Sequence, residues 1–479
     1  MEYDEYEDYD EYDQDNMMQQ YGDEYYDYGD GMQQDQDFTY WGHFENCVVP
    51  SISQGVQITL PLLLLCMAMK VTTLFSLPSS VFHFLSIGSG LVAMAFFFEK
   101  YLFYIISLTV LGYFALQVAN QTLGKYRGAV CAVVVVTYLV IMELFLADPS
   151  QWHRVRGCQM IVAMKIISVG FDVDQGTLKE IPDVIEFTGY CVFAGSIIFG
   201  PWISYSTYAL AAQGVDLDLR YTATVVVKLL QALACLVIST CIAPIMFTSE
   251  SWHYKWLHAY RDAMSFRFSH YFISYLSETT GILAGLGATG NVEEGDKVKW
   301  SFAVAKPLNV ELPRSLVEVV TNWNLPMHSW LKNYVFKTSR HLGNFAAILL
   351  TYAASSLLHG INFQLAAVLL SLGLYSYTEY VLRQKLSDAF SACVGAKACK
   401  PACSHRNKKK NVLVILTNVV FGLLAMFHLA YLGLMFDTDD SELEEQGYDW
   451  THTLSKWSHL NYASHWVALI TFVFYWLIK

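Results

Sequence analysis

One histidine lies inside an apolar stretch of the chain, "SSLLHGINF" at residues 355–363. The segments on both sides contain no charged residue, so we expect His359 at the depth of a membrane, where an ionisable side chain is costly and by default marks a functional site. A neutral imidazole can take the proton of a hydroxyl group that attacks a carbonyl. Ser355 lies one helical turn before this histidine and Gly360 follows it, which leaves room for a cavity. His359 is therefore a candidate general base.

Other histidines compete for this role. His428 lies in "LLAMFHLAYLGLMF", a setting just as apolar, while His270 and His465 are weaker candidates. A neutral histidine can also be structural, with its ring hydrogen-bonded to a carbonyl or hydroxyl group inside a helical bundle. Both interpretations stay open, and the small and hydroxylated neighbours favour His359.

A second candidate is an amide in the short stretch "TNWNLPMHSWL", residues 321–331. Trp323, Asn324 and Trp330 occur there close together, with Pro326 between them. One interpretation is an interfacial helix anchored by its tryptophans. The other is a polar amide that faces a reacting carbonyl, and the residues alone do not decide between them.

Possible metal ligands occur in a basic segment. Cys399, Cys403 and His405 have ligand-like spacing, with Cys393 upstream. A structural zinc site needs four ligands, usually in a folded finger or ribbon, and this spacing matches no standard pair of ligand motifs. We expect reduced or lipidated cysteines here and no metal.

The ten cysteines of the chain do not suggest a disulfide framework. Four of them lie in apolar runs and are interpreted as small core residues: Cys66, Cys131, Cys235 and Cys241. The sequence contains no Gly-rich phosphate-binding loop, no GxSxG and no HExxH motif, and nothing in it supports nucleic-acid binding.

The composition indicates a polytopic membrane protein. Of the 479 residues, 54% are hydrophobic and only 15% are charged, whereas soluble domains carry about 25% charged residues. The net charge of −13 belongs to the N-terminus, because residues 1–38 hold 15 acidic and no basic residues. We therefore expect a disordered acidic tail over residues 1–40 and a membrane domain over residues 41–479.

Apolar segments about long enough to cross a bilayer as helices recur along that domain. We predict an all-α bundle of ten to twelve transmembrane helices. The predicted segments are 55–75, 81–98, 101–119, 128–146, 184–206, 222–247, 264–287, 343–360, 363–383, 411–436 and 460–478. Residues 157–170 are too short to span and are expected to be interfacial or re-entrant.

Charge predicts the orientation of this bundle. Residues 397–410 hold six bases and no acid, whereas residues 437–449 hold seven acids and no base. The first connection is expected to be cytosolic and the second lumenal, with a cytosolic C-terminus and a lumenal acidic tail. The longest polar stretch, 288–341, is expected to be functional. Its bases Lys306, Arg314 and Lys332 are candidates for binding a polyanion, with contact to lipid headgroups as the alternative.

The sequence resembles the membrane-bound O-acyltransferase family. The resemblance rests on "WNLPMHSWL" and on "SSLLHG", whose histidine follows the asparagine by 35 residues. It extends from about residue 150 to the C-terminus through longer segments: "FGPWISY" (199–205), "VAKPLNVELPRSLVEVVTNWNLP" (304–326), "YVFKTSRHLGNFAAILLTYAASSLLHG" (334–360) and "FHLAYLGLMFD" (427–437). The long segments are similar to the members that acylate a protein serine.

The resemblance implies a bundle that encloses a catalytic tunnel in the endoplasmic reticulum membrane. It implies transfer of a palmitoleoyl group from palmitoleoyl-CoA, a co-substrate, to a serine of a Wnt protein, with no bound cofactor. His359 and Asn324 match the catalytic pair of the family. Asn324 would orient the imidazole or donate to the oxyanion. Candidates for substrate binding are Trp323, Trp330, Ser355, Lys306, Arg314 and Lys332.

Rival functions stay open. The catalytic pair alone would also suit a lipid O-acyltransferase. A transporter could use His359 or His428 as a proton relay, although the sequence shows no internal repeat and few intramembrane carboxylates. A non-catalytic chaperone for Wnt proteins is the third alternative.

Overall fold

A computed structural model describes residues 40–75, 78–213, 218–247, 255–289, 299–400, 402–436 and 450–478. The acidic tail predicted for residues 1–40 lies outside these ranges except for Tyr40, and so does the acidic connection 437–449. The chain divides into two units, Met1–Asn46 and Cys47–Lys479. The predicted domain boundary at residue 40 stays a prediction.

The described residues are mainly helical. They form α2 (Tyr40–His43), η1 (Phe44–Val48), α3 (Val49–Thr72), η2 (Thr73–Phe75), α4 (Ser79–Phe98), η3 (Glu99–Tyr101), α5 (Leu102–Thr122), α6 (Arg127–Ile141), η4 (Met142–Leu146), α7 (Pro149–Asp174), α8 (Val184–Cys191), α9 (Ala194–Ile197), α10 (Tyr205–Gln213), α11 (Leu219–Val237), η5 (Ile238–Ile242), η6 (Ala243–Ile245) and α12 (Lys255–Leu283). A two-stranded antiparallel ladder of β1 (Ala288–Thr289) and β2 (Lys299–Trp300) follows. The C-terminal third contains α13 (Pro307–Glu311), α14 (Leu316–Trp323), α15 (Leu325–Trp330), η9 (Leu331–Phe336), α16 (Lys337–Ser339), η10 (Arg340–Leu342), α17 (Asn344–Leu358), α18 (Phe363–Ala389), α19 (Val412–Gly433), η11 (Leu434–Phe436), α21 (Trp450–His459) and α22 (Ala463–Leu477).

Length and apolar composition mark six helical stretches of the described residues as able to cross a membrane. They are Tyr40–Phe75, Ser79–Thr122, Arg127–Leu146, Leu219–Ile245, Phe363–Ala389 and Val412–Phe436. Two shorter apolar helices, α17 and α22, add to them. The all-α polytopic membrane architecture is therefore confirmed, while the prediction of ten to twelve spans also counts helices that are shorter or more polar than these six stretches.

The prediction for residues 157–170 is wrong. They belong to α7, a helix of 26 residues whose positions 161–170 are all buried. This helix packs against α5 and α6. Its length is hidden in the sequence because Arg154, Arg156 and Lys165 lower its hydropathy.

The predicted span 184–206 is also wrong, because the structure breaks it into α8, α9 and an extended segment. Lys165 of α7 lies at the break, where its ammonium group donates to the carbonyls of Tyr190 (2.8 Å) and Cys191 (3.2 Å) at the end of α8. It also donates to the Ser196 hydroxyl (2.9 Å) in α9. A cation that binds the last carbonyls of a helix stabilises its C-terminus.

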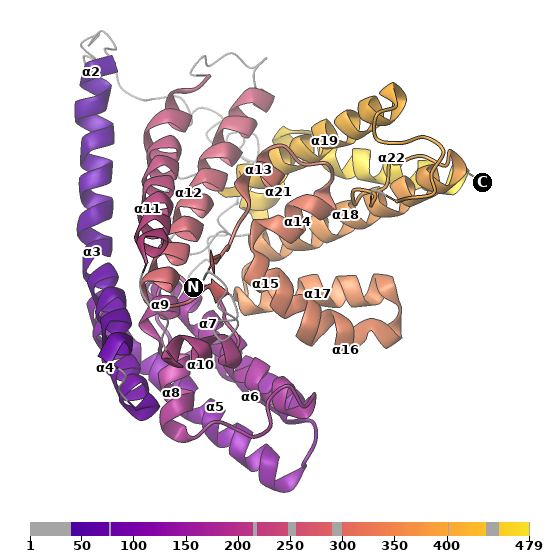
Figure 1. Ribbon diagram of the computed structural model, residues 1–479. Coiled ribbons are helices and arrows are strands. Elements are labelled where there is room, and N and C mark those ends of the chain that lie inside the picture. Colours follow the sequence, from indigo (N-terminus) through magenta and orange to yellow (C-terminus); the bar gives the residue numbers. More distant parts are fainter. Residues whose placement is uncertain are drawn as a thin grey trace, which may run out of the picture. The chain divides into compact units, whose positions relative to one another are not determined.

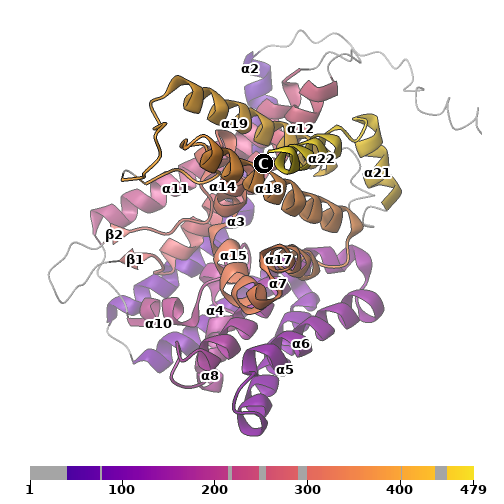
Figure 2. The same cartoon turned by 90° about the vertical axis from the view of Figure 1, so that its right-hand side faces the viewer.

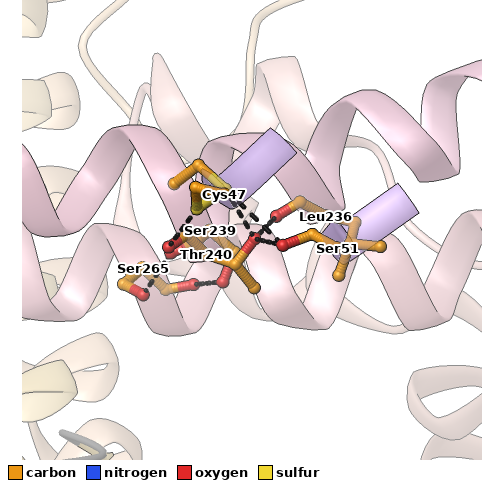
Figure 3. The surroundings of a disulfide bond; sticks show 7 residues. Cys47, Ser51, Leu236, Ser239, Thr240 and Ser265 are labelled. Atoms are coloured by element: carbon orange, nitrogen blue, oxygen red, sulfur yellow. Dashed lines mark hydrogen bonds between the residues drawn. A yellow bond between two sulfur atoms is a disulfide. The ribbon is translucent and has the colours of Figure 1, made fainter. Parts of the chain in front are cut away.

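Cys241 is not a simple core residue. It forms a disulfide with Cys47, 194 positions away (Figure 3). Around this bond the Ser239 hydroxyl donates to the Ser265 carbonyl (2.8 Å), and the Ser265 hydroxyl donates back (2.9 Å), which ties η5 to α12. Disulfides persist in oxidising compartments. The lumenal N-terminus stays a prediction, and in that compartment this bond would persist.

Three helix groups in the body carry the candidate site. The helix α12 packs against α11 and α19, and α18 packs against α17 and α22 (Figures 1 and 2). The third group consists of α7 with α5 and α6, which pack against it. The polar stretch that the sequence marked as functional is folded into α13–α15 and η9, and η9 packs against α17.

Candidate active site

His359 lies at the C-terminal end of α17, where it is partly buried. Its backbone N–H donates to the Ser355 carbonyl (3.2 Å), which confirms the predicted one-turn spacing. No hydrogen bond to the His359 ring forms among the residues that the structure describes.

The turn after His359 is fixed by an ion pair from other elements. Glu143 in η4 and Arg156 in α7 approach to 3.5 Å, and a Glu143 oxygen accepts the backbone N–H of Ile361 (2.8 Å). Gly360 has φ +101°, and a Cβ there would lie 2.6 Å from Arg156 Nη1. Only glycine fits such a position without strain. Arg156 also interacts electrostatically with His359. The sequence analysis missed both Glu143 and Arg156.

Asn324 joins α14 to α15. Its side-chain Oδ1 accepts the backbone N–H of Met327 (3.0 Å) and so caps α15. Only the amide oxygen can accept, so this bond fixes which way the amide points. Within the described ranges, no hydrogen bond from the Asn324 Nδ2 group is formed. The two N–H donors of this amide are available to a ligand.

His270 of α12 contacts the segment that leads to Asn324. Its ring stacks on Trp323 with centroids 4.2 Å apart and an interplanar angle of 6°, and its Nε2 contacts the Trp323 carbonyl (2.9 Å). A carbonyl only accepts, so Nε2 carries the proton. His270 also interacts electrostatically with His359. His270 of α12 therefore packs against the residue that precedes Asn324, and the joint site of His359 and Asn324 stays a prediction.

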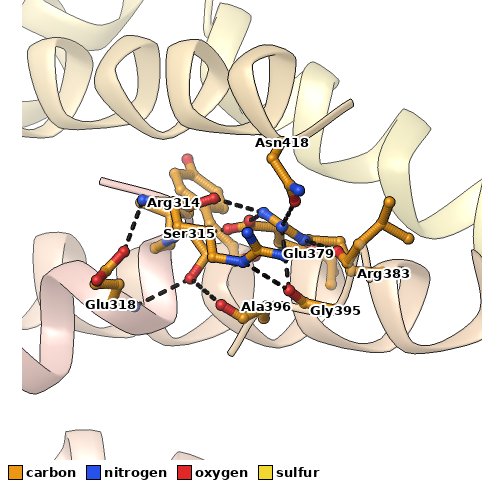
Figure 4. A network of polar contacts seen from close by, with 12 residues as sticks. Arg314, Ser315, Glu318, Glu379, Arg383, Gly395, Ala396 and Asn418 are labelled. Atoms are coloured by element: carbon orange, nitrogen blue, oxygen red, sulfur yellow. Dashed lines mark hydrogen bonds and ion pairs between the residues drawn. The ribbon is translucent and has the colours of Figure 1, made fainter. Parts of the chain in front are cut away.

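A buried network fixes the start of α14, which leads to Asn324 (Figure 4). The Ser315 side chain caps α14 through the Glu318 N–H (3.1 Å), and Glu379 of α18 accepts the Leu316 N–H (2.8 Å). Arg383 of α18 pairs with Glu379 (3.0 Å) and donates to the Arg314 carbonyl (2.6 Å). Glu379 and Arg383 were not predicted, although two opposite charges four residues apart in an apolar helix are a detectable signal.

The remaining predicted binding residues differ in their surroundings. Trp330 is buried and its indole N–H donates to the Met164 carbonyl (3.0 Å) of α7. Ser355 is also buried. The Arg314 guanidinium donates to the carbonyls of Gly395 (3.1 Å) and Cys393 (2.6 Å). These contacts give Trp330 and Arg314 structural roles.

Lys306 and Lys332 are exposed, as a polyanion site requires. Burial, together with the charges of Lys332 and Lys397, lowers the pKa of His328 in α15.

His428 has a different environment. Its ring binds the Ser464 hydroxyl through Nδ1 and lies 4.8 Å from the Tyr375 ring. His465 contacts the Tyr431 hydroxyl (3.0 Å). Within the described part of the chain, His428 and His359 have no hydrogen-bond or ring-stacking partner in common. His428 fits the structural interpretation.

Comparison with known proteins identifies the class. The chain matches the membrane-bound O-acyltransferase family over residues 53–401, so it belongs to this family and is an acyltransferase. It is 45% identical to the protein-serine O-palmitoleoyltransferase porcupine of Homo sapiens over 452 residues, which cover 91% of this chain and 97% of that protein. The protein of the same name from Anopheles gambiae is 34% identical over 466 residues, with 91% and 93% covered. Lysophospholipid acyltransferase 1 of Arabidopsis thaliana is more distant, at 26% identity over 356 residues, 64% of this chain and 76% of that protein.

Proposed function

We propose that the protein transfers a palmitoleoyl group from palmitoleoyl-CoA to a serine hydroxyl of a Wnt protein in the endoplasmic reticulum membrane. The similarity to the porcupine proteins, whose name states this transfer to serine, supports the reaction. The observation that carries it is a pair of groups without a hydrogen-bond partner among the described residues, the His359 ring and the Asn324 N–H donors, with His270 in contact with Trp323 beside Asn324.

The donor in this reaction is a thioester, whose carbonyl is already activated, and the acceptor is a poor nucleophile at neutral pH. The His359 ring takes the serine proton as the serine oxygen attacks the thioester carbonyl. When the tetrahedral intermediate collapses, the carbon–sulfur bond breaks. The imidazolium then returns the proton to the departing thiolate of CoA. The products are a serine ester and free CoA.

Asn324 is assigned to the oxyanion. The bond from the Met327 N–H to Oδ1 orients the amide, and within the described part of the chain its N–H groups have no hydrogen-bond acceptor. An N–H donor stabilises the negative oxygen of the intermediate, and one such donor contributes about 3 kcal/mol. The alternative role, orienting the imidazole through the amide oxygen, would use the second lone pair of Oδ1.

The fold suits substrates that come from different phases. A tunnel through the bundle, as the family resemblance implies, would keep the acyl chain in hydrocarbon while its carbonyl reaches His359. Lys306 and Lys332 are exposed on the polar segment and are our candidates for the phosphates of CoA. A lumenal acceptor would reach the site from the side that carries the Cys47–Cys241 disulfide.

Acyl transfer by the purified full chain in detergent tests this proposal. The assay combines palmitoleoyl-CoA with a disulfide-bonded Wnt hairpin peptide that carries one serine, beside the same peptide with alanine in place of that serine. We expect acylation of the serine peptide only, lost in His359→Ala and retained in His428→Ala. A lysophospholipid as acceptor forms the third arm.

Each contrary outcome has a defined meaning. Acylation of the alanine peptide would overturn serine as the acceptor, and faster transfer to the lysophospholipid would support the lipid O-acyltransferase. No transfer by folded wild-type protein to any acceptor would support the chaperone or transporter interpretation. Equal loss in His359→Ala and His428→Ala would overturn His359 as the unique base.

A further inference from the structure

Four potential metal ligands converge in the loop between α18 and α19. The ligand atoms of Cys393, Cys399, Cys403 and His405 all lie within 4.8 Å of one another. The sulfur of Cys393 is 3.4 Å from that of Cys403. His405 Nδ1 is 3.7 Å from the Cys393 sulfur and 3.5 Å from the Cys399 sulfur. A disulfide would bring two sulfurs to about 2.0 Å, so these are separate thiols.

These spacings match a tetrahedral zinc shell. Zinc binds thiolate sulfur at about 2.3 Å and imidazole nitrogen at about 2.0 Å, so tetrahedral neighbours are about 3.5–3.8 Å apart. We propose that Cys393, Cys399, Cys403 and His405 bind one structural Zn²⁺ ion. The proposal reverses the expectation of no metal that we drew from the sequence spacing.

The hydrogen bonds of His405 select the tautomer that zinc requires. The Ser387 hydroxyl donates its proton to the Ala392 carbonyl (2.7 Å). It can therefore only accept from His405 Nε2, 3.2 Å away, which fixes the histidine proton on Nε2. The lone pair on Nδ1 then faces the sulfurs of Cys393 and Cys399. A metal-bound histidine usually donates its other N–H to such an outer partner.

The loop has few interactions of its own that would keep it folded. Residues 390–411 form no regular helix or strand among the positions described, apart from one isolated bridge between Ala392 and Asn407. Its small apolar cluster contains mainly Ala392, Val394 and Val414 around the cysteines. Six bases repel one another in residues 397–410. A metal bound at four points would hold such a loop compact.

Charge and compartment are compatible with zinc. Three thiolates and one Zn²⁺ leave one net negative charge, and Lys408 Nζ lies 3.7 Å from the Cys403 sulfur. The positive-inside rule predicts a cytosolic location for this loop. Thiols stay reduced there and are available to a metal.

This zinc would support the candidate active site from a distance. The carbonyls of residues 393–396 accept hydrogen bonds from Arg314 and Arg383 and from the Ser315 hydroxyl, which also caps α14 (Figure 4). The helix α14 ends next to Asn324. The cysteine and histidine side chains are therefore positioning residues for Asn324, a consequence that rests on the proposed function, whereas the metal site itself does not.

Metal analysis of the full chain, purified in detergent without chelator, tests the site. We expect inductively coupled plasma mass spectrometry to find about one zinc ion per chain. X-ray absorption at the zinc edge should show three sulfurs at about 2.3 Å and one nitrogen at about 2.0 Å. A chain without stoichiometric zinc would overturn the proposal, and so would zinc surrounded only by nitrogen and oxygen, which indicates adventitious binding.

Variants sharpen the assignment. Cys399→Ser and His405→Ala should lose the zinc, while Cys66→Ser, which changes a buried thiol of α3 outside the loop, should keep it. Ser387→Ala should weaken zinc affinity by about 10- to 100-fold. If the ligand variants do not fold, the absorption spectrum of wild-type protein still decides the ligand set. Retention of zinc in folded Cys399→Ser would remove Cys399 from that set. Acyl transfer is measured separately, so a failed activity would count against the proposed function and leave the metal result unchanged.

Discussion

His359 and His428 lie in equally apolar stretches of sequence, yet the contacts of their rings in the folded chain differ. The ring of His428 is 3% exposed and bound to Ser464. His359 is held by its backbone and its following turn, while no described residue binds its ring. What separates a candidate reactive histidine from a packing residue is therefore whether neighbouring residues hold its backbone or bind its ring, and not how apolar the surrounding sequence is. A catalytic side chain is fixed by its neighbours and left open at the atom that reacts.

The largest effect is expected for His359→Ala. Removal of a general base costs about 10²- to 10⁴-fold in rate, so acyl transfer should fall by that factor with little change in thermal stability. The measurement is kcat for transfer to the serine peptide, beside the melting temperature. A variant that melts much earlier but keeps its kcat would reverse the roles assigned to the two histidines.

Asn324 should show the next largest effect, and two substitutions separate its two functions. Asn324→Asp keeps an oxygen that can cap α15 but has no N–H donor, whereas Asn324→Ala loses both. We expect a fall in kcat of about 10²- to 10³-fold in each variant, with a normal melting temperature in Asn324→Asp only. Full activity in Asn324→Asp would contradict the oxyanion role.

Glu143 tests whether the turn after His359 matters. Glu143→Ala leaves the Ile361 N–H and the Arg156 guanidinium without their acceptor, and we expect kcat to fall about tenfold. Glu143→Gln retains an acceptor and should recover most of the rate. Equal rates in the two variants would show that the hydrogen bond to Ile361 does not position His359.

The smallest effect on activity is expected for His428→Ala. The change leaves a cavity and an unpaired Ser464 hydroxyl, which should lower stability by about 1–3 kcal/mol. The rate should stay within about threefold of wild type, since the ring contacts no group of the candidate site. Thermal unfolding and initial rates, measured on the same preparation, check both statements. A rate loss as large as that of His359→Ala would end the distinction between these residues.

Much of the architecture could be predicted from local sequence. Apolar runs without charge gave correct positions for α3–α6, α11, α17–α19 and α22. The buried α7 was missed because Arg154, Arg156 and Lys165 make it look polar, and Lys165 binds the carbonyls at the end of α8, where the predicted span stops. A hydropathy value is an average over a window of residues, so it does not show that a charged side chain such as Lys165 is buried and hydrogen-bonded to backbone carbonyls.

The candidate site was predictable only in part. His359 and Asn324 carry a motif that can be recognised from residue types, and their catalytic role stays a prediction. Glu143, Arg156 and His270 come from distant segments, and their roles depend on contacts with residues far away in the sequence. The Cys47–Cys241 bond belongs to the same kind, with 194 positions between its partners. Spacing along the chain contains no record of such contacts.

The Cys47–Cys241 bond and the four-ligand loop have a practical consequence for anyone who prepares this protein. A strong thiol reductant preserves the loop cysteines but cleaves the bond between η1 and η5. An oxidant protects that bond and attacks the loop thiols. No single redox buffer suits both the disulfide and the loop thiols, so the chain should be assembled in sealed membranes that keep an oxidising and a reducing compartment apart. After solubilisation it should be kept free of both reagents.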